Sequence, residues 1–135
     1  MKAIPKIQKF MTTTPHAING ESSVEEALKV MDKNKIRHLP VMLSNTAYGL
    51  VSDRDLRRFM ALSSVNPQTI KVRDICEEAP YQTNPNAMIN DVAEQMVERK
   101  IGSALVLDNG KLVGIFTTTD ACQALVEICN QRFHG

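Results

Sequence analysis

An internal repeat with an offset of 65 residues runs through almost the whole of this 135-residue chain. Over residues 7–60, without a gap, eight positions carry the same residue as the position 65 places later: Pro15 with Pro80, Asn19 with Asn84, Met31 with Met96, Lys35 with Lys100, Ile36 with Ile101, Val41 with Val106, Gly49 with Gly114 and Asp55 with Asp120. Such a period indicates two copies of one supersecondary unit, each too small to bury its apolar face alone. We therefore expect repeat 1 at residues 7–62, a linker at residues 63–71 and repeat 2 at residues 72–130.

Each repeat predicts the order strand, helix, strand, strand, helix. In repeat 1, Ser22 and Glu25 form a capping box ahead of apolar residues at helical spacing, so a helix is expected to run to about Lys33. Two short strands and a second helix follow in both repeats. In repeat 1 the strands are expected at residues 38–42 and 48–51, with a helix from Ser52. In repeat 2 they are expected at residues 104–107 and 112–116, with a helix from Thr117 toward Asn130. Asn109-Gly110 is a strong hairpin signal between the last two strands. The pattern predicts an α+β fold in which two β-α-β-β-α repeats pack through their sheets with pseudo-two-fold symmetry.

Both repeats contain one seven-residue pattern at the junction between their last strand and their last helix. It reads Gly, two hydrophobic residues, Ser or Thr, two variable residues and Asp, at residues 49–55 and 114–120. A hydroxyl followed three residues later by a carboxylate is a capping box, which needs no ligand. The same helix start also offers free N–H groups and a positive dipole end for a phosphate, beside a carboxylate that suits ribose hydroxyls. The pattern is therefore consistent with two interpretations, a helix cap alone and a nucleotide-binding corner.

Composition restricts the classes of function. A formal net charge of +1 argues against a general nucleic-acid binder. The longest apolar runs, such as residues 104–107, are far shorter than the roughly 20 residues of a membrane span. Lysines interrupt the apolar residues of the first ten, so no secretory signal is predicted. Three cysteines without CxxC or metal-ligand spacing predict reduced thiols and no metal site. We expect a cytoplasmic protein without membrane insertion.

No recognised catalytic motif is present. The sequence contains no H-E-x-x-H, no G-x-S-x-G and no phosphate loop ending in Gly-Lys-Ser or Gly-Lys-Thr. We therefore predict that the chain is not an enzyme and has no catalytic cofactor.

The whole chain resembles a tandem pair of CBS (cystathionine-β-synthase) domains, also called a Bateman module. The resemblance rests on the two seven-residue motifs, on the strand entries at residues 36–41 and 101–106, and on the repeat openings at residues 11–15 and 76–80. It implies a regulatory module rather than a catalyst. The ligand it implies contains adenosine, as AMP, ADP, ATP or S-adenosylmethionine, and binds between the two repeats.

The resemblance also implies roles for individual residues. The motif hydroxyl meets the phosphate and the motif carboxylate holds the ribose, which here are Ser52 with Asp55 and Thr117 with Asp120. The adenine slot takes walls from both repeats: Leu50, Tyr81 and Ile101 at the Ser52 site, and Ile115, His16 and Ile36 at the Thr117 site.

The two sites differ in charge. Arg37, His38 and Arg54 surround the first motif, and their counterparts at the second are Gly102, Ser103 and Thr119. Because charge-assisted contacts to phosphate are roughly twice as strong as neutral ones, we expect the phosphorylated nucleotide at the Ser52 site. The Thr117 site is expected to be weaker or to take a less charged ligand. His38 is equally open to a structural interpretation, as a histidine at a strand end.

Arg57 and Arg58 lie beyond the first motif, and we interpret them as a solvated helix face, with contact to a partner or nucleic acid as the alternative.

Two functions from different classes remain. The first is an adenine-nucleotide sensor that controls a separate enzyme or transporter through a ligand-dependent conformational change. The second is a structural dimerisation or interaction module whose ligand sites are vestigial. The resemblance further implies a homodimer formed through the helices.

Overall fold

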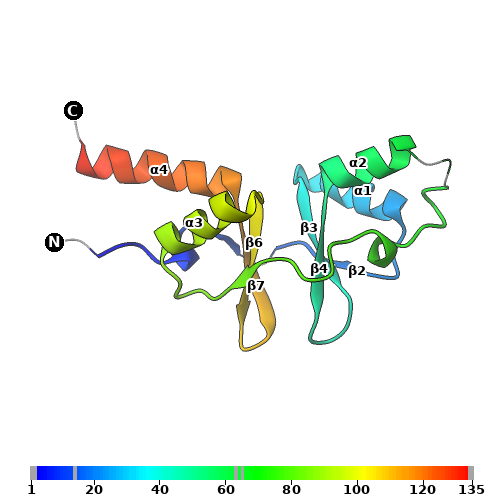
Figure 1. Cartoon of the computed structure of the whole chain (residues 1–135), viewed down its shortest axis with the longest axis horizontal. Helices are drawn as coiled ribbons and strands as arrows, with labels where there is room; N and C mark the ends of the chain where they lie inside the picture. The colour runs from blue at the N-terminus through cyan, green and yellow to red at the C-terminus, as the bar shows by residue number, and fades with distance from the viewer. Residues whose placement is uncertain (1–2, 14, 63, 65, 134–135) are drawn as a thin grey trace. The chain divides into compact units, whose positions relative to one another are not determined.

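The computed structural model describes residues 3–13, 15–62, 64 and 66–133. Thr14 of the first repeat opening and Ser63 and Val65 of the linker lie outside the described residues. The chain forms two compact units, each with its own sheet, drawn in Figure 1. Unit 2 spans His16–Pro80, and unit 1 combines residues 1–15 with residues 81–135. The expected α+β class is confirmed.

Unit 2 is a three-stranded sheet with two helices. The sheet has the order β2-β3-β4, with β2 parallel to β3 and β3 antiparallel to β4. Its elements are β2 (Ile18–Asn19), α1 (Val24–Asn34), β3 (His38–Met42), β4 (Tyr48–Ser52), α2 (Asp53–Leu62) and the 3-10 helix η2 (Val72–Asp74). Both helices and the sheet contribute to one apolar core, formed by Ile18, Val24, Ala27, Met31, Leu39, Val41, Val51, Leu56 and Val72.

Unit 1 repeats this arrangement with one additional strand. Its sheet has the order β1-β7-β6-β5, and the strand β1 comes from the beginning of the chain. Its elements are the 3-10 helix η1 (Ile7–Lys9), β1 (Thr12–Thr13), β5 (Gln82–Thr83), α3 (Ile89–Arg99), β6 (Ser103–Asp108), β7 (Lys111–Thr117) and α4 (Thr118–Arg132). Its core consists of Ile7, Ile89, Val92, Met96, Ala104, Val106, Phe116 and Ala124.

The predicted strands and hairpin are confirmed within one or two residues. Asn109 and Gly110 both have positive φ angles, of 52° and 79°, as a tight two-residue turn between β6 and β7 requires. The capping box predicted at Ser22 and Glu25 is wrong by one residue, because Ser23 is the N-cap and accepts from the N–H of Glu26 at 3.1 Å. The N–H of Ser22 donates to the carbonyl of Asn19, which holds Ser22 in the preceding turn.

The opening segment of repeat 1 packs in unit 1 against the last hairpin of repeat 2. The opening segment of repeat 2 packs in unit 2 against the last hairpin of repeat 1. Thr12 and Thr13 pair with Ile115 and Gly114 of β7 in unit 1. In unit 2, the N–H of Leu50 donates to the carbonyl of Glu77 at 3.0 Å and the reverse bond measures 2.9 Å. Sequence repeats and packing units are therefore different divisions of the chain.

The motif glycines permit this close pairing. A Cβ atom on Gly49 would lie 2.7 Å from the Glu77 carbonyl oxygen and 2.8 Å from Cys76 Sγ, and one on Gly114 would lie 2.5 Å from Met11 Sδ and 3.0 Å from the Thr12 carbonyl oxygen. Neither glycine has a positive φ angle. Their function is therefore to leave space for the neighbouring segment.

The described part of the predicted linker is packed onto unit 2. The N–H groups of Val24 and Glu25, in the first turn of α1, donate to the carbonyls of Ile70 and Pro67 at 2.9 and 3.0 Å. These carbonyls bind N–H groups that have no partner within the helix. The segment therefore caps α1.

Among the described residues, no helix has the length and apolar character needed to cross a bilayer. The same residues contain no cluster of three or more metal-binding side chains.

Candidate functional site

The first motif lies where β4 ends and α2 begins. His38 of β3 is the direct cross-strand partner of Ser52, so their Cβ atoms lie about 5 Å apart on one face of the sheet. The N–H of Asp53 donates to the carbonyl of Arg37 at 2.8 Å, which holds Arg37 beside the first turn of α2. The N–H of Asp55 donates to Ser52 Oγ at 3.0 Å. Unit 2 thus brings together four of the predicted site residues.

Three charged residues of this corner are exposed to solvent. Asp55 is exposed, and within the described residues its carboxylate takes part in no hydrogen bond or ion pair. Arg37 and Arg54 are exposed as well. Burial lowers the pKa of His38, while the Asp55 carboxylate raises it and Arg37 lowers it further. His38 is therefore mainly neutral at pH 7, and two arginines provide positive charge beside the Ser52 hydroxyl and the free Asp55 carboxylate.

The second motif has the same backbone geometry, but its side chains form different hydrogen bonds. Ser103 of β6 is the cross-strand partner of Thr117 and is buried. The N–H of Thr118 donates to the carbonyl of Gly102 at 3.0 Å. Asp120 Oδ2 accepts from the N–H of Thr117 at 2.9 Å and from its hydroxyl at 3.2 Å, and the N–H of Asp120 donates back to Thr117 Oγ1 at 3.4 Å. This is a complete capping box.

The two motifs therefore differ in charge, as the sequence indicates, and also in the hydrogen bonding of the motif carboxylate. Thr119 of the second motif is exposed, and Gly102, Ser103 and Thr119 are all uncharged, so no cation stands where Arg37 and Arg54 stand in the first. The additional difference is that Asp120 is engaged by Thr117, whereas the carboxylate of Asp55 is free.

The predicted adenine-wall residues are divided between the units. Leu50 is buried in unit 2 and Ile115 in unit 1, each within its own motif. Tyr81 and Ile101, assigned to the Ser52 site, belong to unit 1, where the guanidinium of Arg99 lies 4.6 Å from the Tyr81 ring centroid. The other two residues assigned to the Thr117 site belong to unit 2: His16 is exposed and Ile36 packs against the core.

Comparison with known proteins gives the family. Residues 7–62 and residues 72–127 each match the family model described as the CBS domain. The chain belongs to the CBS domain family. Its two matches follow each other in tandem, so it is a CBS pair.

The relatives include proteins of similar length. The CBS domain-containing protein YhcV of Bacillus subtilis is 24% identical over 95% of this chain and 98% of its own. The hexameric CBS-CP12 protein from bloom-forming cyanobacteria is 27% identical, with a TM-score of 0.84 over 94% of this chain and 77% of its own. CBSX2, solved in complex with AMP, is 30% identical, with a TM-score of 0.76 over 91% of this chain and 97% of its own.

Other relatives are longer. The chain spans 24% of the inosine-5'-monophosphate dehydrogenase of Korarchaeum cryptofilum, to which it is 28% identical.

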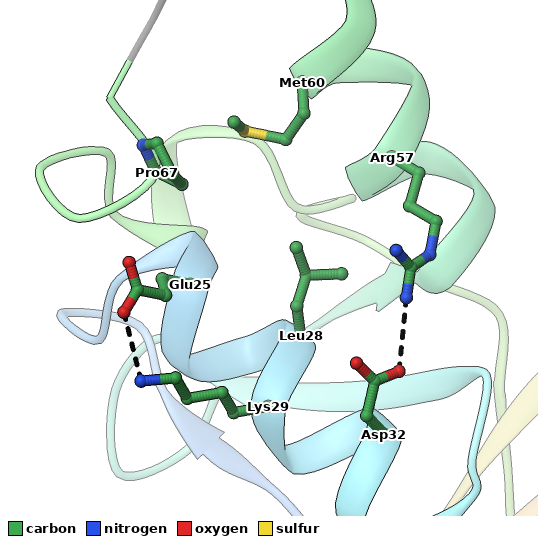
Figure 2. A pocket seen from close by; sticks show the side chains of 7 residues that line it. All are labelled: Glu25, Leu28, Lys29, Asp32, Arg57, Met60 and Pro67. Carbon is green, nitrogen blue, oxygen red and sulfur yellow. Dashed lines mark hydrogen bonds and ion pairs between the residues drawn. The ribbon is translucent and has the colours of Figure 1, made fainter.

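The first CBS repeat has a pocket that none of the seven motif residues lines. It has a volume of about 460 Å³ and lies between α1 and α2, lined by Glu25, Leu28, Lys29, Asp32, Arg57, Met60 and Pro67. Figure 2 shows Leu28 in the middle of the lining, with the Glu25–Lys29 and Arg57–Asp32 ion pairs at its edges. No predicted site residue lines it.

Arg57 has a structural function that sequence reasoning missed. Its Nε donates to Asp53 at 2.8 Å and its Nη2 to Asp32 at 3.2 Å, so it connects α2 to α1. The Asp53–Arg57 spacing of four residues is a signal that would have found the first pair. Arg57 is still largely exposed, as the solvated-face interpretation expects.

Proposed function

We propose that this CBS pair is a regulatory module that binds an adenine nucleotide at the Ser52/Asp55 corner and controls a separate enzyme or transporter by changing conformation. The observation that carries the proposal is the free Asp55 carboxylate beside the Ser52 hydroxyl, with Arg37, His38 and Arg54 around them. A carboxylate suits ribose hydroxyls, and cations at a helix start suit a phosphate. The solved AMP complex of CBSX2, 30% identical, supports AMP as the first ligand to test.

The roles of the remaining site residues are predictions within this proposal. Leu50, Tyr81 and Ile101 are assigned to the adenine at the Ser52 site, and Ile115, His16 and Ile36 to the Thr117 site. S-adenosylmethionine is the alternative ligand, and the Thr117 site is expected to bind more weakly or to take a less charged ligand. Self-association is part of the proposal, since the related CBS-CP12 protein is hexameric.

Isothermal titration calorimetry with AMP, ADP, ATP and S-adenosylmethionine tests the ligand and the site. We expect Asp55→Asn to weaken AMP binding at least about tenfold, equivalent to about 1.4 kcal/mol. Asp120→Asn is the matched control, because it changes the equivalent carboxylate, and it is expected to leave that affinity nearly unchanged. Equal losses from the two substitutions would contradict the assignment to the Ser52 corner.

The second candidate function is an interaction module with vestigial sites. It is favoured by the capping box at Thr117, which satisfies both motif side chains without a ligand. A thermal-shift screen with the same four compounds separates the two functions, because a ligand at 100 times its Kd adds about 2.7 kcal/mol of stability. A flat response to all four supports the interaction module.

A further inference from the structure

A second pocket lies in unit 1, between α3 and the first turn of α4, which are neighbouring helices in Figure 1. It has a volume of about 280 Å³. No charged residue is in its lining, which consists of Ala93, Met96, Val97, Ile101, Thr118 and Ala121. Met96 is buried, whereas Val97 and Thr118 are exposed. The pocket is therefore apolar inside and open to solvent at its rim.

Comparison with repeat 1 explains why unit 1 has this pocket. At the offset of 65 residues, Leu28 corresponds to Ala93 and Leu56 corresponds to Ala121. Leu56 belongs to the core of unit 2 and Leu28 packs against it. Alanine at the position of a packed leucine leaves a cavity, because the neighbouring side chains collapse into the space only in part. Repeat 2 has alanine at both positions, and both alanines line the pocket.

Larger side chains elsewhere in repeat 2 do not fill this space. Val92 corresponds to Ala27, and Phe116 corresponds to Val51. Both larger residues are buried in the core of unit 1, and neither lines the pocket. An apolar cavity of this kind lowers the stability of a fold, whereas a ligand that fills it raises the stability. The two alanines are therefore better explained by a bound ligand than by packing.

The ion pairs that join the two helices of unit 2 have no equivalent in repeat 2. In unit 2, the guanidinium of Arg57 donates to Asp53 and to Asp32. The corresponding residues of repeat 2 are of uncharged types: Cys122, Thr118 and Val97. A charged ligand would find no opposite charge in the lining, and burial of an unpaired charge is strongly unfavourable. The pocket therefore favours an uncharged ligand.

Volume and polarity define the ligand further. An apolar cavity of about 150 Å³ binds benzene, so a volume of about 280 Å³ has room for one ring or two fused rings. Thr118 has the only hydroxyl among the six lining residues, and this hydroxyl donates to the carbonyl of Gly102 at 3.3 Å. Its oxygen can still accept a hydrogen bond. One donor on the ligand would therefore have a partner at the rim.

We infer that this pocket binds a small, uncharged aromatic molecule with at most one hydrogen-bond donor. The ring occupies the space beside Ala93 and Ala121, where repeat 1 has leucines, and the donor binds the Thr118 hydroxyl. Thr118 directly follows the motif residue Thr117, so the ligand lies beside the second motif and outside it. The inference does not depend on nucleotide binding at the Ser52 corner or on self-association.

Methyl NMR of the full chain with indole as the probe tests the site. Indole has two fused rings, one N–H donor and no charge, and all six lining residues carry a methyl group. We expect ring-current shifts that saturate with indole concentration and are centred on these methyl groups. Benzoate has an aromatic ring and a charged carboxylate, so it is expected to leave the same signals unchanged. No shift with indole, or equal binding of benzoate, would overturn the inference.

Filling the pocket is the second test. Ala121→Leu introduces the residue of repeat 1 and is expected to weaken indole binding at least about tenfold, since one methylene in an apolar pocket has an effect of that size. Ala93→Leu is expected to do the same, and it serves as the second variant if Ala121→Leu fails to fold by circular dichroism. Ala61→Leu is the matched control, because Ala61 is exposed on α2 and outside the pocket. Indole binding that is equally strong in all three variants contradicts the assignment to this pocket.

Sedimentation equilibrium distinguishes a small ligand from a second copy of the chain as the occupant. We expect Ala121→Leu and the wild type to have the same mass at the same concentration, because the inferred ligand binds within one chain. If the substitution changes the mass and the wild type does not bind indole, a second copy fills the pocket and the inference is wrong. Unchanged mass together with weakened indole binding supports it.

Discussion

Asp120 accepts two hydrogen bonds from Thr117, one from its N–H at 2.9 Å and one from its hydroxyl at 3.2 Å. The equivalent pair in the other repeat, Asp55 and Ser52, shares only the bond from the Asp55 N–H to the Ser52 hydroxyl. One motif carboxylate thus stabilises its own helix while the other is available to a ligand.

Replacing these carboxylates is expected to affect stability differently. Asp120→Ala removes two partly buried hydrogen bonds and should lower the free energy of unfolding by about 1 kcal/mol more than Asp55→Ala. Both residues occupy the third position of a helix, so the loss of the favourable helix-dipole interaction is common to both and cancels in the comparison. Urea denaturation of the two variants measures the difference. Equal destabilisation would mean that the capping box at Thr117 contributes nothing.

Stability is expected to fall in mild acid because of His38. Burial lowers its pKa below the ordinary value of 6.5, so the unfolded chain takes up this proton at a higher pH than the folded chain. The stabilising contribution of neutral His38 is therefore fully present above pH 6.5 and decreases as the pH falls below that value. Thermal unfolding of the wild type and His38→Gln at several pH values between 5 and 8, a range set by histidine titration, checks this. Identical pH dependence in the two proteins would contradict it.

Gly49→Ala is expected to destabilise unit 2. The new methyl group would lie 2.7 Å from the carbonyl oxygen of Glu77, and that carbonyl is fixed by its bond to the Leu50 N–H. Overpacking of this kind costs about 1–3 kcal/mol. Gly114→Ala is expected to cost less, because its shortest contact is with the thioether of Met11, which can move. Chemical denaturation ranks the two variants, and a Gly49→Ala protein as stable as the wild type would disprove the close-approach explanation.

The three thiols are expected to react at two different rates. Burial raises the pKa of Cys76, and the Glu78 carboxylate raises it further, whereas Cys122 and Cys129 are exposed on α4. A chromogenic disulfide reagent should label two thiols quickly and one slowly, since the thiolate is the reactive form. Cys76→Ser should remove only the slow phase. A slow phase that persists in that variant would refute the assignment.

Sequence reasoning gave the repeat, the strand positions and the hairpin because these depend on local patterns that the 65-residue offset shows twice. It expected Ser52, Asp55 and His38 at one corner, and in the structure Ser52 and His38 are cross-strand partners and Asp55 lies in the first turn of the helix that follows. It missed the packing of residues 12–13 against β7, because such pairing has no local signature. It could not predict that the Asp120 carboxylate is hydrogen-bonded while the Asp55 carboxylate is free, since both motifs fit the same capping pattern.

The pairing of Thr12 with Ile115 also constrains how the protein can be made and divided. These residues lie about 100 positions apart, so contacts of this kind form late and slowly. During synthesis, β1 has no partner until the ribosome has added the residues of β7, and unit 2 can close first. Any cut at the linker would also leave each fragment holding a strand segment that its counterpart needs. The two halves are therefore expected to recover their native structure only when both are present together.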